Sequence, residues 1–249
     1  MAERKGGIGR VIYWIVVIAL LCVIGFSAFK IGTILYGYWE GTKTYNHVAK
    51  EAGVKKGNDE IKINWKKLRG KYPDVKAWIY CKGTVLNYPV VQGKDNEQYL
   101  HHMINGQWNG KGTLFIDHRT KRPFKQFLTT IYGHHMRDGS MFGSLVKYRK
   151  SDYYRKHKVI KLYTPQKNYD MKVIGVCTIP AKSERYRLNF QGNEDRAEYI
   201  RWIEEATETE CDDHATPEDT LVMLSTCTYE YDNARCVVFG KLVPNRNAK

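Results

Sequence analysis

Cys227 is the residue of this sequence best suited to act as a nucleophile. It ends the run LSTC, in which Ser225 and Thr226 separate it from the apolar residues 221–224 that predict a strand. A cysteine at the end of a strand can present its sulfur at the rim of a sheet, where a substrate can reach it. Most single cysteines are buried structural thiols, so this interpretation depends on the side chains that lie near Cys227.

Arg235 could be one such neighbour. It opens the next predicted strand, after the turn-forming segment 231–234, so an antiparallel pair of strands would bring it beside Cys227. A guanidinium there can stabilise a thiolate and donate hydrogen bonds to an anionic tetrahedral intermediate. Without the cysteine, a solvent-exposed arginine is the simpler interpretation.

His134 could supply the acid and the base. It follows Gly133 in the run IYGHHM, where the predicted strand 128–133 stops, and an imidazole exchanges protons near neutral pH. His135 competes for this role. The pair could also join other histidines around a metal, namely His101, His102 or His118. We expect no metal or other cofactor, because the HH dipeptide lacks the spacing of zinc motifs and the chain has no CxxC or HExxH.

The cysteine count is compatible with a free thiol. Of the six cysteines, Cys22 lies inside an apolar run, and the remaining five are an odd number: Cys81, Cys177, Cys211, Cys227 and Cys236. At least one of these thiols is therefore unpaired or bonded to another chain. The sequence leaves open whether the four besides Cys227 are oxidised.

Short strands are predicted to position these residues. From residue 74 onward the hydrophobic period is two, and turn-forming residues separate the runs. The predicted strands are 77–81, 84–86, 88–92, 113–117, 128–133, 159–163, 169–178, 220–228 and 235–243. Helices are predicted over 139–154 and 195–209, and in the second Tyr199, Trp202, Ile203 and Ala206 share a face. We therefore predict a mostly β fold with flanking helices, a closed or nearly closed barrel.

The N-terminal region is predicted to anchor the chain in a membrane. Residues 11–29 carry no charge and would span about 28 Å as a helix. Basic residues precede them, which places the N-terminus in the cytoplasm and the rest outside the cell. A cleavable signal peptide is the alternative, but no clear small-x-small cleavage site follows. The predicted parts are a cytoplasmic N-terminus (1–10), a transmembrane signal anchor (11–29), a helical juxtamembrane region (30–73) and a catalytic β-barrel domain (74–249).

Within residues 30–73, an apolar stripe predicts a helix that docks on the core. Its members are Ile61, Trp65, Leu68 and Tyr72. The whole chain has a formal net charge of +14. For a domain outside the cell, this charge favours an anionic envelope or phospholipid head groups over nucleic acid, and a basic but merely well-solvated surface explains it equally well.

The sequence also resembles the class B sortases. The resemblance runs from about residue 61 to 243 and is carried by the segments WIYCKGTVLNYPVVQGKDNEQYLHH, GTLFIDHR, IYGHHMRDGSMFGSL and LSTC and by the strand that begins at Arg235. It implies an eight-stranded β-barrel with N-terminal helices and a helix before the penultimate strand. It also implies a catalytic triad of His134, Cys227 and Arg235, and so selects His134 over His135.

By the same resemblance, the chain is a cysteine transpeptidase that forms a thioacyl-enzyme. Class B sortases cleave NPxT-like sorting signals of surface proteins after Thr and transfer them to a peptidoglycan amino group. The implied substrate contacts are Asn87, Thr226, Tyr186 and Leu188. Many class B members carry Asp after the cysteine and a longer loop before the arginine, whereas here Thr228 follows and seven residues intervene.

Two other functions stay open at the level of the sequence. A membrane-tethered cysteine protease would use the same thiol to release peptides by hydrolysis. A papain-like order is disfavoured, because His134 precedes Cys227 here. A non-catalytic module that binds an anionic envelope would fit the basic charge but gives no reason for a reactive thiol.

Overall fold

The computed structural model describes residues 5–54 and 60–245. Its contacts divide the chain into two units, Met1–Lys43 and Thr44–Lys249. The helix α1 (Lys5–Glu51) contains the apolar segment, and over Gly9–Glu51 it is long and apolar enough to cross a membrane. The predicted anchor 11–29 thus lies inside a much longer helix, which continues into the predicted juxtamembrane region.

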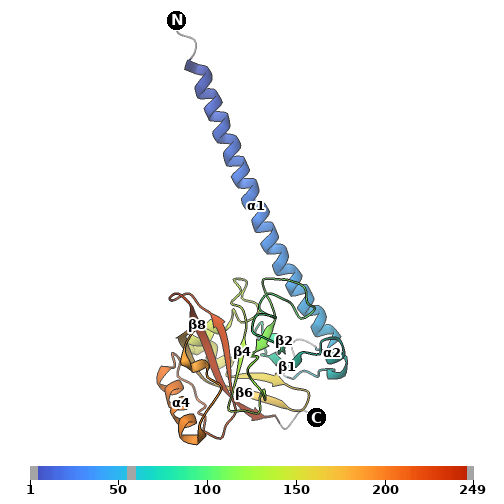
Figure 1. Ribbon diagram of the computed structural model, residues 1–249, viewed down its shortest axis with the longest axis vertical. Coiled ribbons are helices and arrows are strands. Elements are labelled where there is room, and N and C mark those ends of the chain that lie inside the picture. The colour runs from blue at the N-terminus through green and yellow to red at the C-terminus, as the bar shows by residue number, and fades with distance from the viewer. Residues whose placement is uncertain (1–4, 55–59, 246–249) are drawn as a thin grey trace. The chain divides into compact units, whose positions relative to one another are not determined.

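Eight strands in the second unit form a closed barrel (Figure 1). They are β1 (Val75–Tyr80), β2 (Asn87–Val91), β3 (Leu114–Ile116), β4 (Leu128–Tyr132), β5 (Val159–Tyr163), β6 (Asn168–Pro180), β7 (Leu221–Cys227) and β8 (Ala234–Pro244). Their order around the barrel is β1-β2-β3-β4-β7-β8-β6-β5, and β1 pairs with β5 to close it. Neighbours are antiparallel except β2 with β3 and β4 with β7, which are parallel. The predicted mostly β barrel is confirmed.

Short helices complete the described part of this unit. They are α2 (Trp65–Lys71), the 3-10 helix η1 (Leu145–Arg149), α3 (Ser151–Lys156), the 3-10 helix η2 (Glu184–Tyr186) and α4 (Gly192–Ala206). The helix α4 packs on the outside of the barrel against β6. Its buried Tyr199 and Ile203 join β-strand residues in one apolar cluster, with Trp202 and Ala206 packed against it. The predicted apolar face of this helix is confirmed.

One predicted strand is wrong. Residues 84–86 form part of a turn, in which Gly83 has φ 77°. The Thr84 hydroxyl donates to the carbonyl oxygen of Cys81 and accepts from the Leu86 N–H, at 2.8 and 3.1 Å. A short polar side chain thus satisfies backbone groups that a strand would have paired.

Two predicted helices are also shorter than expected. The segment 139–154 begins with a turn in which Gly139 and Met141 have positive φ, so helix starts only at η1 and α3. The stripe that begins at Ile61 is not one helix, because the Asn64 side chain caps α2 by accepting from the Lys67 N–H. Ile61 is buried before that helix, and its N–H donates to the Tyr163 hydroxyl at 3.1 Å.

Candidate active site

Three neighbouring strands align His134, Cys227 and Arg235 in one row. The strands β4 and β7 pair in parallel from Leu128↔Leu221 to Tyr132↔Ser225. The same register, carried two residues beyond the last pair, sets His134 opposite Cys227. On the other side of β7, Cys227 pairs directly with Arg235. Residues opposite one another in adjacent strands project from the same face of a sheet, so the three side chains share one side of the rim.

Backbone and side-chain contacts hold this row in register. The Gly133 N–H donates to the Ser225 carbonyl at 3.1 Å, and the Thr226 hydroxyl donates to the Gly133 carbonyl at 2.8 Å. On the Cys227 side, His135 Nδ1 lies 2.7 Å from the Cys227 carbonyl oxygen. His135 therefore supports the backbone of Cys227 and is absent from the lining of the cavity that contains His134.

Gly133 has to be a glycine because of close packing. A Cβ atom at this position would lie 2.4 Å from Leu114 Cδ2 and 2.7 Å from Phe142 Cδ2. Atoms do not approach so closely without displacing something. The strand β4 can therefore run directly into His134 only if residue 133 has no side chain.

His134 is held through one ring nitrogen. Its Nε2 lies 2.6 Å from the Leu100 carbonyl oxygen. A carbonyl only accepts, so Nε2 carries a proton, and Nδ1 is the nitrogen available for acid–base exchange. The ring also stacks on His101, with centroids 5.4 Å apart. Burial lowers the pKa of His134; the Leu100 bond acts in the opposite direction, and His101 lowers it further.

Arg235 lines the same cavity. Its Nη1 donates to the Ala234 carbonyl at 3.0 Å. No ion pair joins Arg235 to any residue within 5–54 or 60–245. The other N–H groups of this side chain are therefore available to an anion that forms in the cavity.

The cavity has a volume of about 370 Å³. Its wall contains the aligned row together with Asn96, Glu97, Leu100, Phe115, Tyr132, Gly133, Ala181, Tyr186, Ser225 and Thr226. Of the four substrate contacts implied by resemblance, Tyr186 and Thr226 line it. Leu188 lines a different cavity, and the Asn87 side chain accepts from Trp78 Nε1 at 2.8 Å. As substrate contacts, all four stay predictions.

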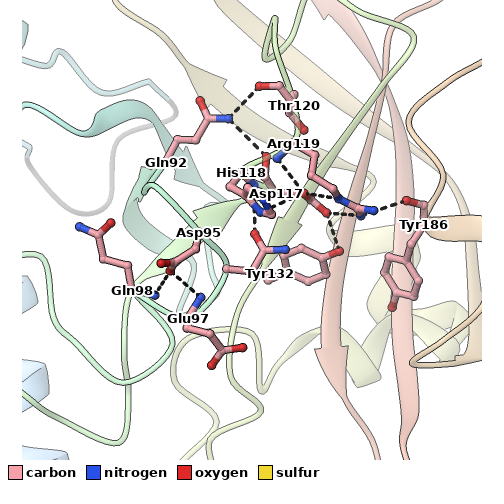
Figure 2. A network of polar contacts seen from close by, with 11 residues as sticks. Gln92, Asp95, Glu97, Gln98, Asp117, His118, Arg119, Thr120, Tyr132 and Tyr186 are labelled. Carbon is pink, nitrogen blue, oxygen red and sulfur yellow. Dashed lines mark hydrogen bonds and ion pairs between the residues drawn. The ribbon is translucent and has the colours of Figure 1, made fainter.

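A buried carboxylate supports one wall of the cavity. Figure 2 shows Asp117 between Arg119 and Tyr132. Arg119 donates to both carboxylate oxygens, at 2.9 and 2.7 Å, and the Tyr132 hydroxyl donates to Oδ2 at 3.1 Å. Burial alone would raise the pKa of Asp117, but the bonds from Arg119 more than offset it and lower the pKa.

This network extends to the loop that carries Tyr186. Arg119 Nη2 lies 3.5 Å from the Tyr186 carbonyl oxygen (Figure 2), and the Tyr132 and Tyr186 rings stack with centroids 5.9 Å apart. The Tyr186 hydroxyl in turn lies 2.8 Å from Ser225 Oγ. Tyr186, which lines the cavity, is thus fixed to both β4 and β7.

The loop between Cys227 and Arg235 is held by a second network. Glu230 accepts from Arg149 and from the Thr228 hydroxyl. Arg149 also forms an ion pair with Glu208, with 3.1 Å between Nε and Oε2. The Thr228 N–H donates to the Ala234 carbonyl at 3.0 Å, which continues the pairing of the two strands past Cys227.

The other thiols of this unit differ from Cys227 in their surroundings. Burial raises the pKa of Cys177 and Cys236 to about 12 and that of Cys211 to about 11. Burial also raises the pKa of Cys81. These four remain protonated at neutral pH and are poor nucleophiles. All six cysteines are unpaired, and Cys227 is the one that lines the cavity.

Sequence reasoning did not identify Leu100 and Asn96 as parts of this site. Leu100 contacts His134 through its backbone carbonyl oxygen, which every residue type has, so the sequence gives no signal for this contact. Asn96 fixes a loop by accepting from the His118 N–H at 3.0 Å. Within residues 5–54 and 60–245, no cluster of three or more His, Cys, Asp or Glu could hold a metal ion.

Comparison with known proteins gives one consistent result. A family model described as the sortase domain matches residues 79–243. Sortase B of Listeria monocytogenes is 29% identical over 232 residues, which cover 91% of this chain and 94% of that protein. The Staphylococcus aureus sortase B–substrate complex matches with a TM-score of 0.69 and 31% identity, covering 72% of this chain and 84% of that one. A sortase B complexed with triglycine matches with a TM-score of 0.68 and 31% identity, covering 72% and 85%. The resemblance seen in the sequence and its eight-stranded barrel are confirmed.

Proposed function

Because the chain belongs to the sortase family and is a cysteine transpeptidase, we propose that it cleaves an NPxT-like sorting signal after Thr and transfers the protein to a peptidoglycan amino group. The observation that supports this most directly is the row of His134, Cys227 and Arg235 across β4, β7 and β8. Acyl transfer through a thiol needs a nucleophile, a proton carrier and a stabiliser of negative charge within reach of one carbonyl.

In the first half-reaction, the Cys227 thiol passes its proton to His134, and Sγ attacks the carbonyl carbon of the Thr residue. A carbon–sulfur bond forms, and the carbonyl electrons move onto oxygen. When the tetrahedral intermediate collapses, the carbon–nitrogen bond breaks and the leaving amine takes a proton from His134. Since Nε2 is bonded to Leu100, the proton moves through Nδ1.

In the second half-reaction, an amine enters the cavity and attacks the thioacyl carbon. His134 Nδ1 accepts the proton of the amine, the carbon–sulfur bond breaks, and a new amide forms. The cavity of about 370 Å³ is large enough to admit a peptide segment beside the sulfur. Transfer predominates over hydrolysis when the amine is better positioned than water.

Arg235 stabilises the oxyanion in both half-reactions. It is the cross-strand neighbour of Cys227 and lines the same cavity, and within the described residues only its Nη1 donates a hydrogen bond. Removing one donor of this kind typically costs about 2.7 to 4 kcal/mol in the activation barrier. A planar guanidinium can donate two parallel hydrogen bonds, which an ammonium cannot.

The substrates are inferred from two kinds of support. Related sortase B structures are described as complexes with a substrate and with triglycine, and these agree with a peptide donor and an amine acceptor here. The apolar helix α1 supports a single-pass membrane protein whose barrel lies outside the cell. Surface proteins that carry a sorting signal would then meet the enzyme at the membrane.

The test uses the full chain in neutral detergent. It is incubated with fluorogenic NPxTx and LPxTx peptides, with triglycine or a diaminopimelate-containing peptide as acceptor, and the products are identified by mass. We expect the NPxTx acyl group on the acceptor. Free acid as the only product in the presence of both acceptors would contradict the proposed transfer, and the absence of any cleavage would contradict the proposed sorting signal.

The variant Cys227→Ala tests the assignment of the nucleophile. Cleavage should fall by more than about a thousandfold, because no other described thiol lines the cavity. Cys211→Ala is the matched control, since it removes a half-buried thiol elsewhere and should keep full activity. Full activity of Cys227→Ala, or an acyl group trapped on another cysteine, would contradict the assignment.

A further inference from the structure

The loop between β3 and β4 carries three exposed cations that separate two cavities. We call Lys121, Arg122 and Lys125 the basic ridge. On one side lies a cavity of about 430 Å³, and on the other a cavity of about 380 Å³; all three ridge residues line both. We refer to these as the first and the second cavity. Neither contains Cys227 in its lining.

The second cavity is lined by cations without any carboxylate. Arg69 and Lys76 add to the three ridge residues there. Across the stretches 5–54 and 60–245, none of these five side chains forms an ion pair. By contrast Lys71, Lys161 and Lys172 each have an acidic partner at 2.8 to 3.0 Å. Five positive charges without an acidic partner in the described residues thus line this one cavity.

The first cavity adds two arginines with different surroundings. Arg119 forms an ion pair with Asp117, whereas Arg196 Nε is buried without a hydrogen-bond partner in the part of the chain described. Two carboxylates also line this cavity. Glu218 accepts from Asn193 at 3.0 Å, and Asp219 accepts from the Thr216 N–H at 2.8 Å. The second cavity and the ridge are therefore the stronger anion site, and Arg196 extends it.

The ridge is rigid. The Lys125 and Gln126 N–H groups donate to the Arg122 carbonyl at 3.1 and 3.2 Å, and the Gln126 side chain accepts from the Arg122 N–H at 3.2 Å. Phe124 has φ 60°, which is unusual for a residue with a large side chain. Its ring is buried and its N–H donates to the Thr129 hydroxyl at 2.9 Å. The cations are thus presented on a fixed backbone, which lowers the entropy lost on binding.

From this arrangement we infer that the basic ridge and its two cavities bind a polyanion with one phosphate per repeat, which crosses the ridge from the second cavity to the first. One phosphate within a polymer carries a single negative charge, whereas the ridge, Arg69, Lys76 and Arg196 offer six cationic side chains without an acidic partner in the described residues. A ligand with charges repeated along a chain matches this layout better than one head group. The site is separate from the transpeptidase reaction proposed above.

Binding of defined short-chain inorganic polyphosphate to the full chain in neutral detergent tests the inference. The variant Lys121→Gln, Arg122→Gln, Lys125→Gln removes the ridge charges. The control Lys150→Gln, Arg155→Gln, Lys156→Gln removes two lysines and one arginine that are exposed and line neither cavity. Affinity is measured as a function of salt, and peptide cleavage by each variant reports whether the fold and the active site are intact.

We expect the ridge variant to lose at least about tenfold in affinity and the slope of log affinity against log salt to fall by about two to three. The control should stay within about twofold, and all three proteins should cleave peptide equally. Equal losses of affinity in both variants would show that binding depends only on the net charge of the protein, and would overturn the inference. So would binding to vesicles with anionic lipid in preference to polyphosphate, or competition by inorganic phosphate at the same concentration of phosphate groups.

Discussion

Glu230→Gln should loosen the loop that joins Cys227 to Arg235. The carboxylate accepts from Arg149, which is anchored in η1, and from the Thr228 hydroxyl next to the proposed nucleophile. Glutamine keeps the shape of the side chain but loses the charge. The change therefore removes the ion pair with little effect on packing.

The size of the effect follows from the pKa of Glu230. Burial would raise this pKa, but the hydrogen bonds from Arg149 and Thr228 lower it from 4.5 to about 2. At about 1.36 kcal/mol per pKa unit this difference would be worth roughly 3 kcal/mol. The Glu230 side chain is 43% exposed, so solvent screens the pair. We therefore expect a loss of about 1 kcal/mol in the free energy of unfolding at neutral pH.

The pH dependence has a definite sign. A carboxylate whose folded pKa is depressed stabilises the fold above its unfolded pKa and stops doing so as the pH falls through its folded pKa. The difference between the parent and Glu230→Gln should therefore be complete at pH 7 and shrink as the pH falls below 4.5 toward about 2. A difference that grows on acidification would contradict this explanation.

Thermal unfolding followed by tryptophan fluorescence measures the effect, with peptide cleavage alongside. For a unit of this size, about 1 kcal/mol corresponds to a Tm shift of about 2 to 4 °C. Asp232→Asn is the matched control, because Asp232 is exposed in the same loop and has no ion pair with any residue the structure describes. Since the loop sets the approach of Cys227 to Arg235, kcat/KM should also fall severalfold in Glu230→Gln. Equal Tm values for the two variants at pH 7 would refute the reasoning.

Three further predictions concern the row itself. Arg235→Lys should lower peptide cleavage by about a hundredfold or more while alkylation of Cys227 keeps its pH dependence, because an ammonium lacks the planar fork; near-equal cleavage would exclude oxyanion stabilisation. On the acid side of the pH profile, kcat/KM should fall with a midpoint below pH 6.5, because His134 must be neutral to accept the thiol proton and burial lowers its pKa. A midpoint above 6.5 would contradict this prediction. Gly133→Ala should cost about 1 to 3 kcal/mol in stability and most of the activity through overpacking, whereas Gly110→Ala, where a Cβ meets nothing within 4 Å, should be neutral.

Local patterns in the sequence predicted most of the strands but only the pairings across short turns, namely that of β5 with β6 and that of β7 with β8. The two final strands are separated by a short loop, so their antiparallel pairing, and with it the contact between Cys227 and Arg235, could be expected from the sequence. The pairing of β4 with β7 could not, because a parallel pair of strands far apart in the chain leaves no turn signal. His134 was therefore joined to Cys227 only by the resemblance to class B sortases.

Contacts made by backbone atoms could not be predicted from the sequence for a different reason. The Leu100 carbonyl fixes the His134 ring, yet any residue type could offer that oxygen. The false strand at 84–86 has a related cause. Its β-branched residues fit a strand pattern, but the Thr84 hydroxyl bonds the local backbone, and this competition depends on the turn at Gly83.

The loop between Cys227 and Arg235 is short, and contacts at both of its ends hold it in place. Thr228 stands where many class B members carry Asp, and only seven residues lead to Arg235. In the structure the Thr228 N–H extends the β7–β8 pairing to Ala234, and its hydroxyl reaches Glu230, which Arg149 holds from outside the loop. A short loop with both ends paired has little conformational freedom. The negative charge that Asp would supply directly after the cysteine is thus present two residues later, on Glu230, where Arg149 neutralises it, and Arg235 has no acidic partner among the described residues.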